Sequence, residues 1–206
     1  MRRTKEDAEK TRLAILASAE QLFLEKGVAH TSLEHIARHA GVTRGAVYWH
    51  FQNKAHLFHD MLNQVRLPLE PLADELTAAG GMPSLQLLRD RCIEAMTNLE
   101  RDEKRRRILT VLLRRCEFTD DLREAEERHE AFVNQFIELC KQQFEHPGVQ
   151  ELMQPGVTPH IASRALHALL IGMFSDWLRN PQLFDVHRDA PLMIDSCFRG
   201  LLREWP

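Results

Sequence analysis

A short segment near the N-terminus gathers side chains that can bind nucleic acid. It runs from Thr43 to Lys54 and contains a guanidinium, a phenol, an indole, an imidazole and an ammonium group. An arginine can donate to O6 and N7 of guanine, and hydroxyl or ring groups can contact phosphates and thymine methyls. Small residues between them let a backbone approach base edges. The candidate DNA-contacting residues are Thr31, Thr43, Arg44, Gly45, Ala46, Tyr48, Trp49, His50 and Lys54.

The flanking residues predict the helices that would position this segment. Thr31 to Glu34 reads as a capping box that opens one helix, which Gly41 ends. Thr43 caps a second short helix, from Arg44 to about Phe51. A glycine-containing turn between two short capped helices is typical of a helix-turn-helix. Asn53 caps the next helix, whose first residue, Lys54, opposes the helix dipole, which favours a phosphate contact.

Helical periodicity continues along the whole chain, and no segment has the alternation of a strand. We therefore expect an all-α fold of about nine helices, with the longest in the C-terminal half. Pro68 and Pro71 should kink or interrupt the fourth helix, and residues 80–83 should form a break. The later helices are expected at about 84–99, 103–116, 120–144, 158–179 and 191–203.

Size and charge suggest a small basic domain joined to a larger acidic one. The chain has 206 residues, 28% of them charged, with a net charge of −3. Residues 1–66 hold 10 Lys and Arg against 7 Asp and Glu, whereas the remainder is acidic. We expect a DNA-binding domain at 1–53 and a second domain at 54–206. The charged N-terminus and the lack of a long apolar segment lead us to expect a cytoplasmic protein without membrane association.

The run from Thr31 through Ala37, with that from Ala40 through Lys54, resembles the TetR family of transcriptional regulators. Within this family it is similar to the AcrR-related branch of multidrug-efflux repressors, as are Arg2 to Glu6 and Cys116 to Thr119. The resemblance implies a homodimer that binds a palindromic operator, represses an efflux-pump operon and is released by drug-like inducers. No cofactor is implied.

The resemblance also suggests where a partner subunit and an inducer would bind. It places the dimer interface in the last two helices, where our candidates are Trp177, Leu178, Phe198 and Leu201. It places an apolar pocket among the fifth to eighth helices, in which methionine and phenylalanine suit varied ligands. Any of these residues could equally be plain core. The candidate ligand-binding residues are Leu88, Cys92, Met96, Leu109, Leu113, Phe136, Cys140, His167, Leu170, Ile171 and Phe174.

Other chemistry receives less support from the residues. His35 and His39 have the spacing of metal ligands on a helix, but solvated faces or phosphate contacts explain them more simply, and we expect no metal. The basic run 104–107 could contact nucleic acid, although pairing with the acids of 117–130 is the simpler interpretation. The four cysteines could sense oxidants or be buried thiols. The sequence contains no hydrolase, zinc-protease or phosphate-loop motif, so we do not expect this protein to be an enzyme.

Overall fold

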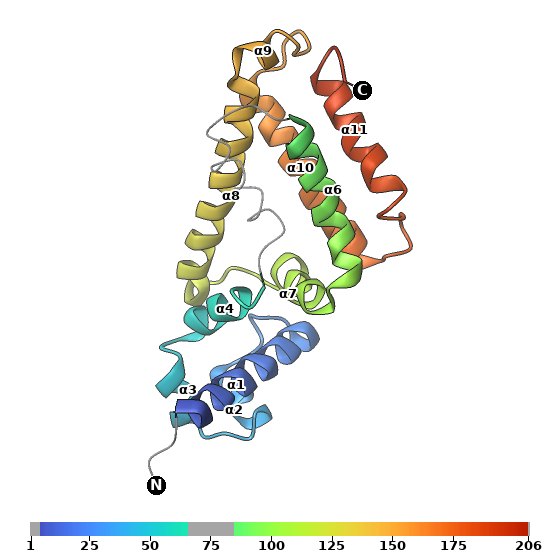
Figure 1. Cartoon of the computed structure of the whole chain (residues 1–206). Coiled ribbons are helices and arrows are strands. Elements are labelled where there is room, and N and C mark those ends of the chain that lie inside the picture. The colour runs from blue at the N-terminus through green and yellow to red at the C-terminus, as the bar shows by residue number, and fades with distance from the viewer. Residues whose placement is uncertain (1–4, 66–84, 206) are drawn as a thin grey trace. The chain divides into compact units, whose positions relative to one another are not determined.

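The computed structural model of the chain describes residues 5–65 and 85–205. These residues form α-helices and one short 3-10 turn, η1, and contain no strand beyond a single bridge between Met153 and Leu202. The all-α expectation is confirmed (Figure 1). The elements are α1 Lys5–Lys26, α2 Leu33–His39, α3 Arg44–His50, α4 Lys54–Leu62, α6 Leu85–Arg101, α7 Glu103–Arg114, η1 Asp120–Leu122, α8 Arg123–Glu145, α9 Pro147–Gln150, α10 Pro159–Arg179 and α11 Asp189–Leu201.

Contacts group the chain into two compact units. Unit 1 contains residues up to 66 together with 104–129, and unit 2 contains 67–103 and 130–206. The expected division after residue 53 stays a prediction, whereas packing groups α4, α7 and η1 with the helices before that point. The expected kink at Pro68 and Pro71 and the break at 80–83 lie outside the described residues.

The core of unit 1 holds α3 in place through its inward side chains. Val47 and Phe51 are fully buried, as is Ile36 of α2. Phe23 of α1 packs edge-on against Phe58 of α4, with ring centroids 6.0 Å apart. Since α2 and α3 both pack on α1, the outward side of α3 has a fixed orientation.

Glycines end the helices where the sequence predicts. Gly27 and Gly41 have φ angles of 85° and 67°, in the left-handed region that side chains disfavour. Gly41 lies in the turn between α2 and α3, and the Val42 N–H there donates to the Ala37 carbonyl at 3.0 Å. The helix-turn-helix geometry therefore depends on Gly41.

The N-cap of α2 differs from the prediction. Ser32, rather than Thr31, accepts the backbone N–H of His35, at 3.2 Å. The His35 ring in turn accepts the Ser32 N–H, at 3.4 Å, so His35 takes the place predicted for Glu34. The Thr31 hydroxyl instead donates to the Gly27 carbonyl, at 2.8 Å. The caps predicted at Thr43, Asn53 and Thr158 are confirmed.

Helix α7 is bound to α1 and to the turn that follows α1. The Val28 N–H donates to the Arg115 carbonyl at 2.9 Å. Arg107 pairs with Glu20 of α1, whose side chain is mostly buried. Arg107 belongs to the basic run 104–107. For this residue the expected pairing with the acids of 117–130 is wrong.

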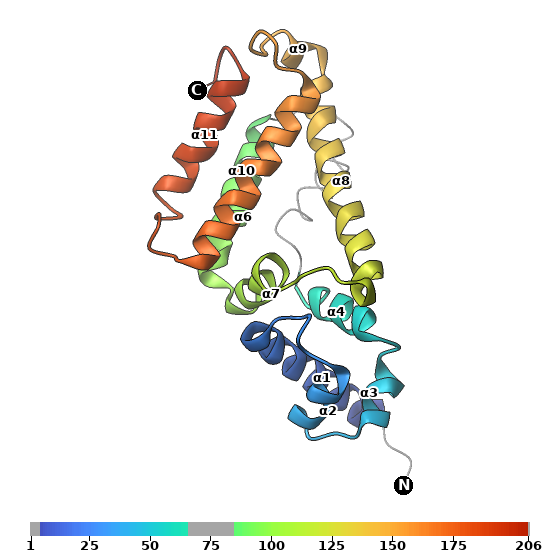
Figure 2. The same cartoon turned by 180° about the vertical axis from the view of Figure 1, so that it is seen from behind.

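Unit 2 is built around α6, α10 and α11, which pack on one another (Figure 2). Asp195 of α11 accepts from Arg89 of α6 through both carboxylate oxygens, at 2.7 and 2.8 Å. The Trp205 indole N–H donates to the same carboxylate at 3.1 Å, and its ring stacks on Phe198 at 4.4 Å. This bidentate pair joins α6 to α11. None of the helices among residues 5–65 and 85–205 is long and apolar enough to cross a membrane.

Candidate nucleic-acid interface

Helix α3 presents one buried side and one exposed side. Thr43 caps it by accepting the Ala46 N–H at 3.2 Å, while the fully buried Val47 anchors it to the core. Tyr48 is 45% exposed and Trp49 is 72% exposed. A tryptophan so open to solvent on a helix that is anchored from behind points to a binding surface. Thr43, Arg44 and Gly45 share this exposure, and Ala46 and His50 are half-buried.

Arg44 lies along the surface of α3 against Tyr48. Its guanidinium donates to the Tyr48 hydroxyl at 3.4 Å and lies 5.4 Å from the centre of the ring. This hydrogen bond raises the pKa of the Arg44 guanidinium. The tyrosine therefore restricts the rotamers of an otherwise exposed arginine.

A row of rings continues from Trp49 into the core of unit 1. The Trp49 and His50 rings meet edge to face with centroids 4.5 Å apart, and the His50 ring lies 6.1 Å from that of Phe51. The Phe51 and His56 ring centroids lie 5.8 Å apart, and the Arg12 guanidinium lies over the Phe51 ring, 5.8 Å from its centre. The exposed aromatic end of α3 is thus supported by residues of α1 and α4.

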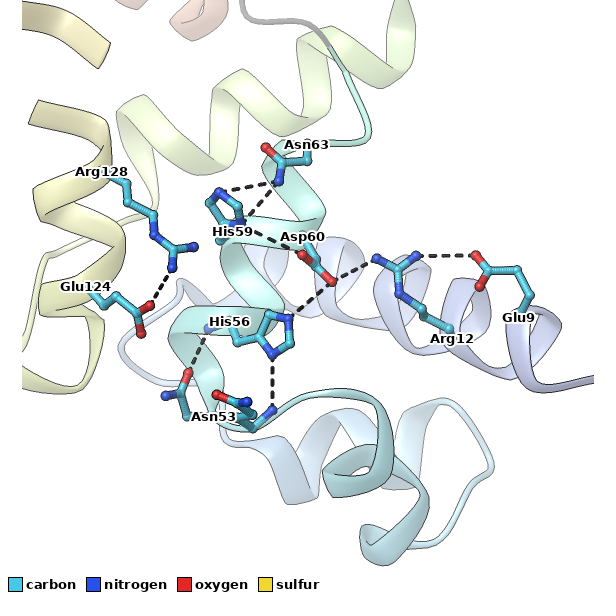
Figure 3. Close-up of polar contacts among 10 residues, drawn as sticks. Glu9, Arg12, Asn53, His56, His59, Asp60, Asn63, Glu124 and Arg128 are labelled. Carbon is cyan, nitrogen blue, oxygen red and sulfur yellow. Dashed lines mark hydrogen bonds and ion pairs between the residues drawn. The ribbon is translucent and has the colours of Figure 1, made fainter. Parts of the chain in front are cut away.

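Asp60 of α4 joins α4 to Arg12 of α1 (Figure 3). Its carboxylate accepts from Arg12 at 2.8 Å and lies 3.6 Å from the His56 ring, one helical turn earlier. The hydrogen bond from Asp60 raises the pKa of the Arg12 guanidinium. The other nitrogen of His56 accepts the Gln52 N–H at 3.2 Å, which ties the end of α3 to the same network. Sequence reasoning missed this network, because its members are ordinary helix-surface residues in the sequence.

Two predicted DNA contacts have side chains that are withdrawn from the surface. Thr31 is 1% exposed and its hydroxyl donates inward, to the carbonyls of Gly27 and Leu22. Lys54 was expected to contact phosphate, but its side chain is only 12% exposed. Its ammonium contacts the Asp121 carboxylate at 2.8 Å and the Val28 carbonyl at 3.1 Å. The Asp121 carboxylate therefore pairs with the ammonium that was expected to contact phosphate.

A polar hollow of about 380 Å³ opens between the start of α2, α3, the start of α4 and η1. It brings Arg44 and Tyr48 of α3 together with Lys54 of α4. Sequence reasoning could not place Asp121 in the lining of this hollow, since Asp121 lies 67 positions after Lys54 in the chain. The residues that line it are Ala29, His30, Thr31, Ser32, Leu33, Glu34, Arg44, Tyr48, Lys54 and Asp121.

The candidate ligand-binding residues divide between the units. Leu109 and Leu113 belong to α7 of unit 1, and the other nine belong to α6, α8 and α10 of unit 2. Within unit 2 the Phe136 and His167 rings lie 6.2 Å apart. Most of the nine are buried, and His167 and Ile171 are half-buried. The buried ones lie on the inner sides of their helices, as both a pocket lining and a plain core require.

The cysteines do not have the environment of reactive thiols. Cys92 and Cys140 are fully buried, and burial raises the pKa of both. Burial also raises the pKa of Cys116, to about 12, and that of Cys197. Since the thiolate is the form that reacts with oxidants, the protonated thiols expected at neutral pH argue against a redox switch.

Comparison with known families covers most of the chain. Residues 15–61 match the model of bacterial regulatory proteins of the tetR family. Residues 83–202 match the C-terminal region of MAATS-type transcriptional repressors. The regulator TtgR of Pseudomonas putida is 34% identical over 95% of this chain and 93% of its own length. AcrR of Shigella flexneri is 30% identical over 92% and 88%, respectively.

Solved structures show the same arrangement of helices. NalD of Pseudomonas aeruginosa, described as the secondary repressor of the MexAB-OprM multidrug efflux pump, is 62% identical, with a TM-score of 0.88. The match covers 98% of this chain and all of that one. A complex of SmeT with triclosan is 31% identical, with a TM-score of 0.74 over 94% of this chain and 92% of that chain. The likeness thus extends through both units.

Proposed function

The chain belongs to the TetR family of bacterial regulatory proteins, and we propose on that premise that it represses an efflux-pump operon by binding a near-palindromic operator as a homodimer. The observation that carries this proposal is the exposed row Arg44, Tyr48 and Trp49 on a capped, anchored α3. A helix of this kind fits the major groove with its N-terminal residues against base edges. A protein that regulates a bacterial operon must reach the chromosome, so we propose that this protein is cytoplasmic.

We assign base contacts to the first turn of α3 and backbone contacts to its aromatic end. Arg44 can pair with a guanine, and Gly45 and Ala46 bring the helix close to the base edges. Tyr48, Trp49 and His50 suit phosphates, sugars and thymine methyls, and Thr43 suits a phosphate. Thr31 drops out of the proposed set because its side chain is buried.

The dimer is proposed to form through the exposed faces of α10 and α11. Trp177, Phe198 and Leu201 are buried within the protomer, at 5%, 0% and 6% exposure, so they have little surface left for a partner. The exposed faces of the same helices carry Ile161 and Leu192, at 49% and 57% exposure. Small residues continue both faces, and these are Ala168, Gly172, Ser196 and Gly200. Small residues between large apolar ones allow helices to pack closely across a twofold axis.

Gly172→Arg is expected to convert the dimer into a folded monomer. A Cβ added at Gly172 would meet nothing within 4 Å in the protomer, and arginine favours a helix by roughly 0.7–1 kcal/mol over glycine. The new side chain would clash only with a partner. Sedimentation velocity and circular dichroism measure both properties. Ala131→Arg, on the exposed side of α8, is the control and should remain dimeric. A dimeric Gly172→Arg protein would place the interface elsewhere.

The inducer is proposed to bind within unit 2, among α6, α8 and α10. This interior is lined by buried apolar side chains of α6 and α10, namely Leu88, Met96 and Phe174. The Phe136 ring of α8 also lies close to the His167 ring of α10. SmeT, of the same family, has been solved with triclosan, an apolar aromatic compound. A ligand could prefer a conformation of the dimer in which the two α3 helices do not match the half-site spacing. Such a ligand would lower the operator affinity by as much as its own affinity differs between that conformation and the DNA-binding one.

Operator selection followed by titration with triclosan tests this function. Selection from a randomised duplex pool should enrich an inverted repeat with half-sites about one helical turn apart (~34 Å) or a small multiple of it. Triclosan should weaken binding to that duplex roughly 5- to 150-fold, and the operator should weaken triclosan binding by the same factor. Fluorescence anisotropy and calorimetry measure the two sides. A pool without an inverted repeat would contradict the operator. Equal triclosan affinity for free and operator-bound protein would contradict induction by this compound.

A further inference from the structure

The position of Lys54 in unit 1 is unusual for a cation expected to meet DNA. It is the first residue of α4, and its ammonium lines the polar hollow beside Arg44 and Tyr48 of α3. The same ammonium contacts Asp121 at 2.8 Å and the Val28 carbonyl at 3.1 Å. In the proposed operator complex, DNA phosphates beside α3 would lie near Arg44 and Tyr48, which line the same hollow as Lys54. Lys54 would then have two anions within reach, a phosphate and the acid of its own chain.

Asp121 is fixed in this place by the surrounding turn. It lies in η1, whose Leu122 is fully buried and whose neighbour Thr119 donates its hydroxyl to the Asp121 carboxylate. Lys54 and Thr119 lower the pKa of the Asp121 carboxyl, so it is an anion at neutral pH. Its side chain is nonetheless 54% exposed. A fixed, half-exposed carboxylate next to a DNA-facing hollow repels phosphate and attracts the cation that phosphate would use.

We propose that Asp121 acts as an internal competitor of operator phosphate for Lys54, which deepens the proposed repressor function and rests on it. In the absence of DNA the Asp121 carboxylate holds the ammonium. On the operator, a phosphate at the hollow draws Lys54 away from Asp121 or shares it. The ion pair therefore lowers the affinity for every DNA sequence alike. Because η1 connects α7 to α8, a change in the position of these helices also changes how firmly Lys54 is held.

Asp121→Asn in the full-length dimer tests the competition. Asparagine keeps the size and an oxygen acceptor for Lys54 but removes the negative charge. Binding to the selected operator and to a random duplex should each become about two- to fivefold tighter per half-site. The slope of log affinity against log salt should become steeper by up to roughly one per half-site, because one more phosphate displaces counterions. Fluorescence anisotropy from low to moderate salt measures both quantities.

Asp120→Asn is the matched control. It makes the same charge change one residue away, in a side chain that is 96% exposed and paired with Arg123. It reports the long-range effect of one negative charge, so only the excess effect of Asp121→Asn supports the competition. Lys54→Gln should weaken binding and flatten the salt slope, and adding Asp121→Asn to it should have no more effect than Asp120→Asn has.

Each outcome decides the proposal. If Asp121→Asn equals Asp120→Asn, or binds DNA more weakly than the wild type, then the ion pair is a structural contact and the competition is wrong. An additive effect of Asp121→Asn in the Lys54→Gln background has the same meaning. Failure of the repressor function looks different, since the wild-type protein would then enrich no inverted repeat in the selection.

Discussion

Asp195→Ala is expected to lower the free energy of unfolding by about 3 kcal/mol, at the lower end for a broken buried ion pair. The Asp195 side chain is 12% exposed, and its carboxylate accepts from Arg89 at 2.7 and 2.8 Å and from the Trp205 indole. Alanine would remove the acceptor of the Trp205 indole N–H and of two Arg89 donors, and would leave Arg89 only its more exposed contact with Asp90 among the contacts described. The Arg89 side chain is 23% exposed, and water would therefore compensate part of the loss.

Guanidinium denaturation followed by tryptophan fluorescence measures this difference, since Trp205 lies at the site. Asp176→Ala is the control, because that aspartate forms only an exposed pair with Arg179 and should change stability by less than about 0.5 kcal/mol. Arg89 and Trp205 lower the pKa of Asp195 in the folded protein. The pair therefore stabilises fully above the unfolded pKa of about 3.9 and loses its contribution as the pH falls through the lower folded value. A stability gap between wild type and Asp195→Ala that widened in acid would contradict this assignment.

The helices were predictable because their ends carry strong local signals. Gly27 and Gly41 adopt the left-handed conformation that their positions suggest, and Thr43 and Asn53 cap as expected. The cap of α2 was ambiguous because two hydroxyl residues, Thr31 and Ser32, precede the helix. The deciding factor is tertiary, since the bond of Thr31 to Gly27 buries its hydroxyl in the turn after α1.

The role of Lys54 could not be read from the sequence for a different reason. A lysine in the first turn of a helix lacks a favourable local partner, which suggested an external anion. Its partner is instead Asp121, which the packing of η1 on α4 brings close. The same limit applies to Arg107 and Glu20, and to the Arg89–Asp195 pair that spans 106 positions of sequence. Long-range ion pairs depend on tertiary contacts that periodicity does not encode.

The dimer candidates show what hydrophobic periodicity can and cannot resolve. A helix that is apolar nearly all round is expected to be buried on two sides. In the protomer α10 has one buried and one exposed side, so burial of the second side against a partner stays a prediction. Periodicity does not say which side faces the protomer. The largest residues, Trp177 and Phe198, pack inside unit 2, and the side left exposed carries Gly172 and Gly200. Small residues produce a weak hydrophobic signal, so the proposed partner surface was not visible in the pattern.

Arg44→Ala is expected to have the largest effect on operator recognition. Loss of an arginine that pairs with guanine lowers affinity roughly 5- to 150-fold per half-site, and the twofold dimer loses the contact in both half-sites. The loss should fall on the selected operator and not on a random duplex, so that the ratio of the two affinities collapses. The arginine is exposed and bonded only to Tyr48 among the contacts described above, so the variant should melt at the wild-type temperature.

Tyr48→Phe and Arg38→Ala separate the parts of this prediction. Tyr48→Phe removes the hydroxyl that accepts from Arg44 and keeps the ring over which the guanidinium lies. If Tyr48 positions Arg44, this variant should lose part of the discrimination between operator and random duplex, and should lose nothing further in an Arg44→Ala background. Arg38→Ala removes an exposed arginine of α2 that pairs with Glu34, and it should lower both affinities equally if at all. Equal losses on operator and random duplex in Arg44→Ala would make Arg44 a phosphate contact and leave the reading of bases to the rest of α3.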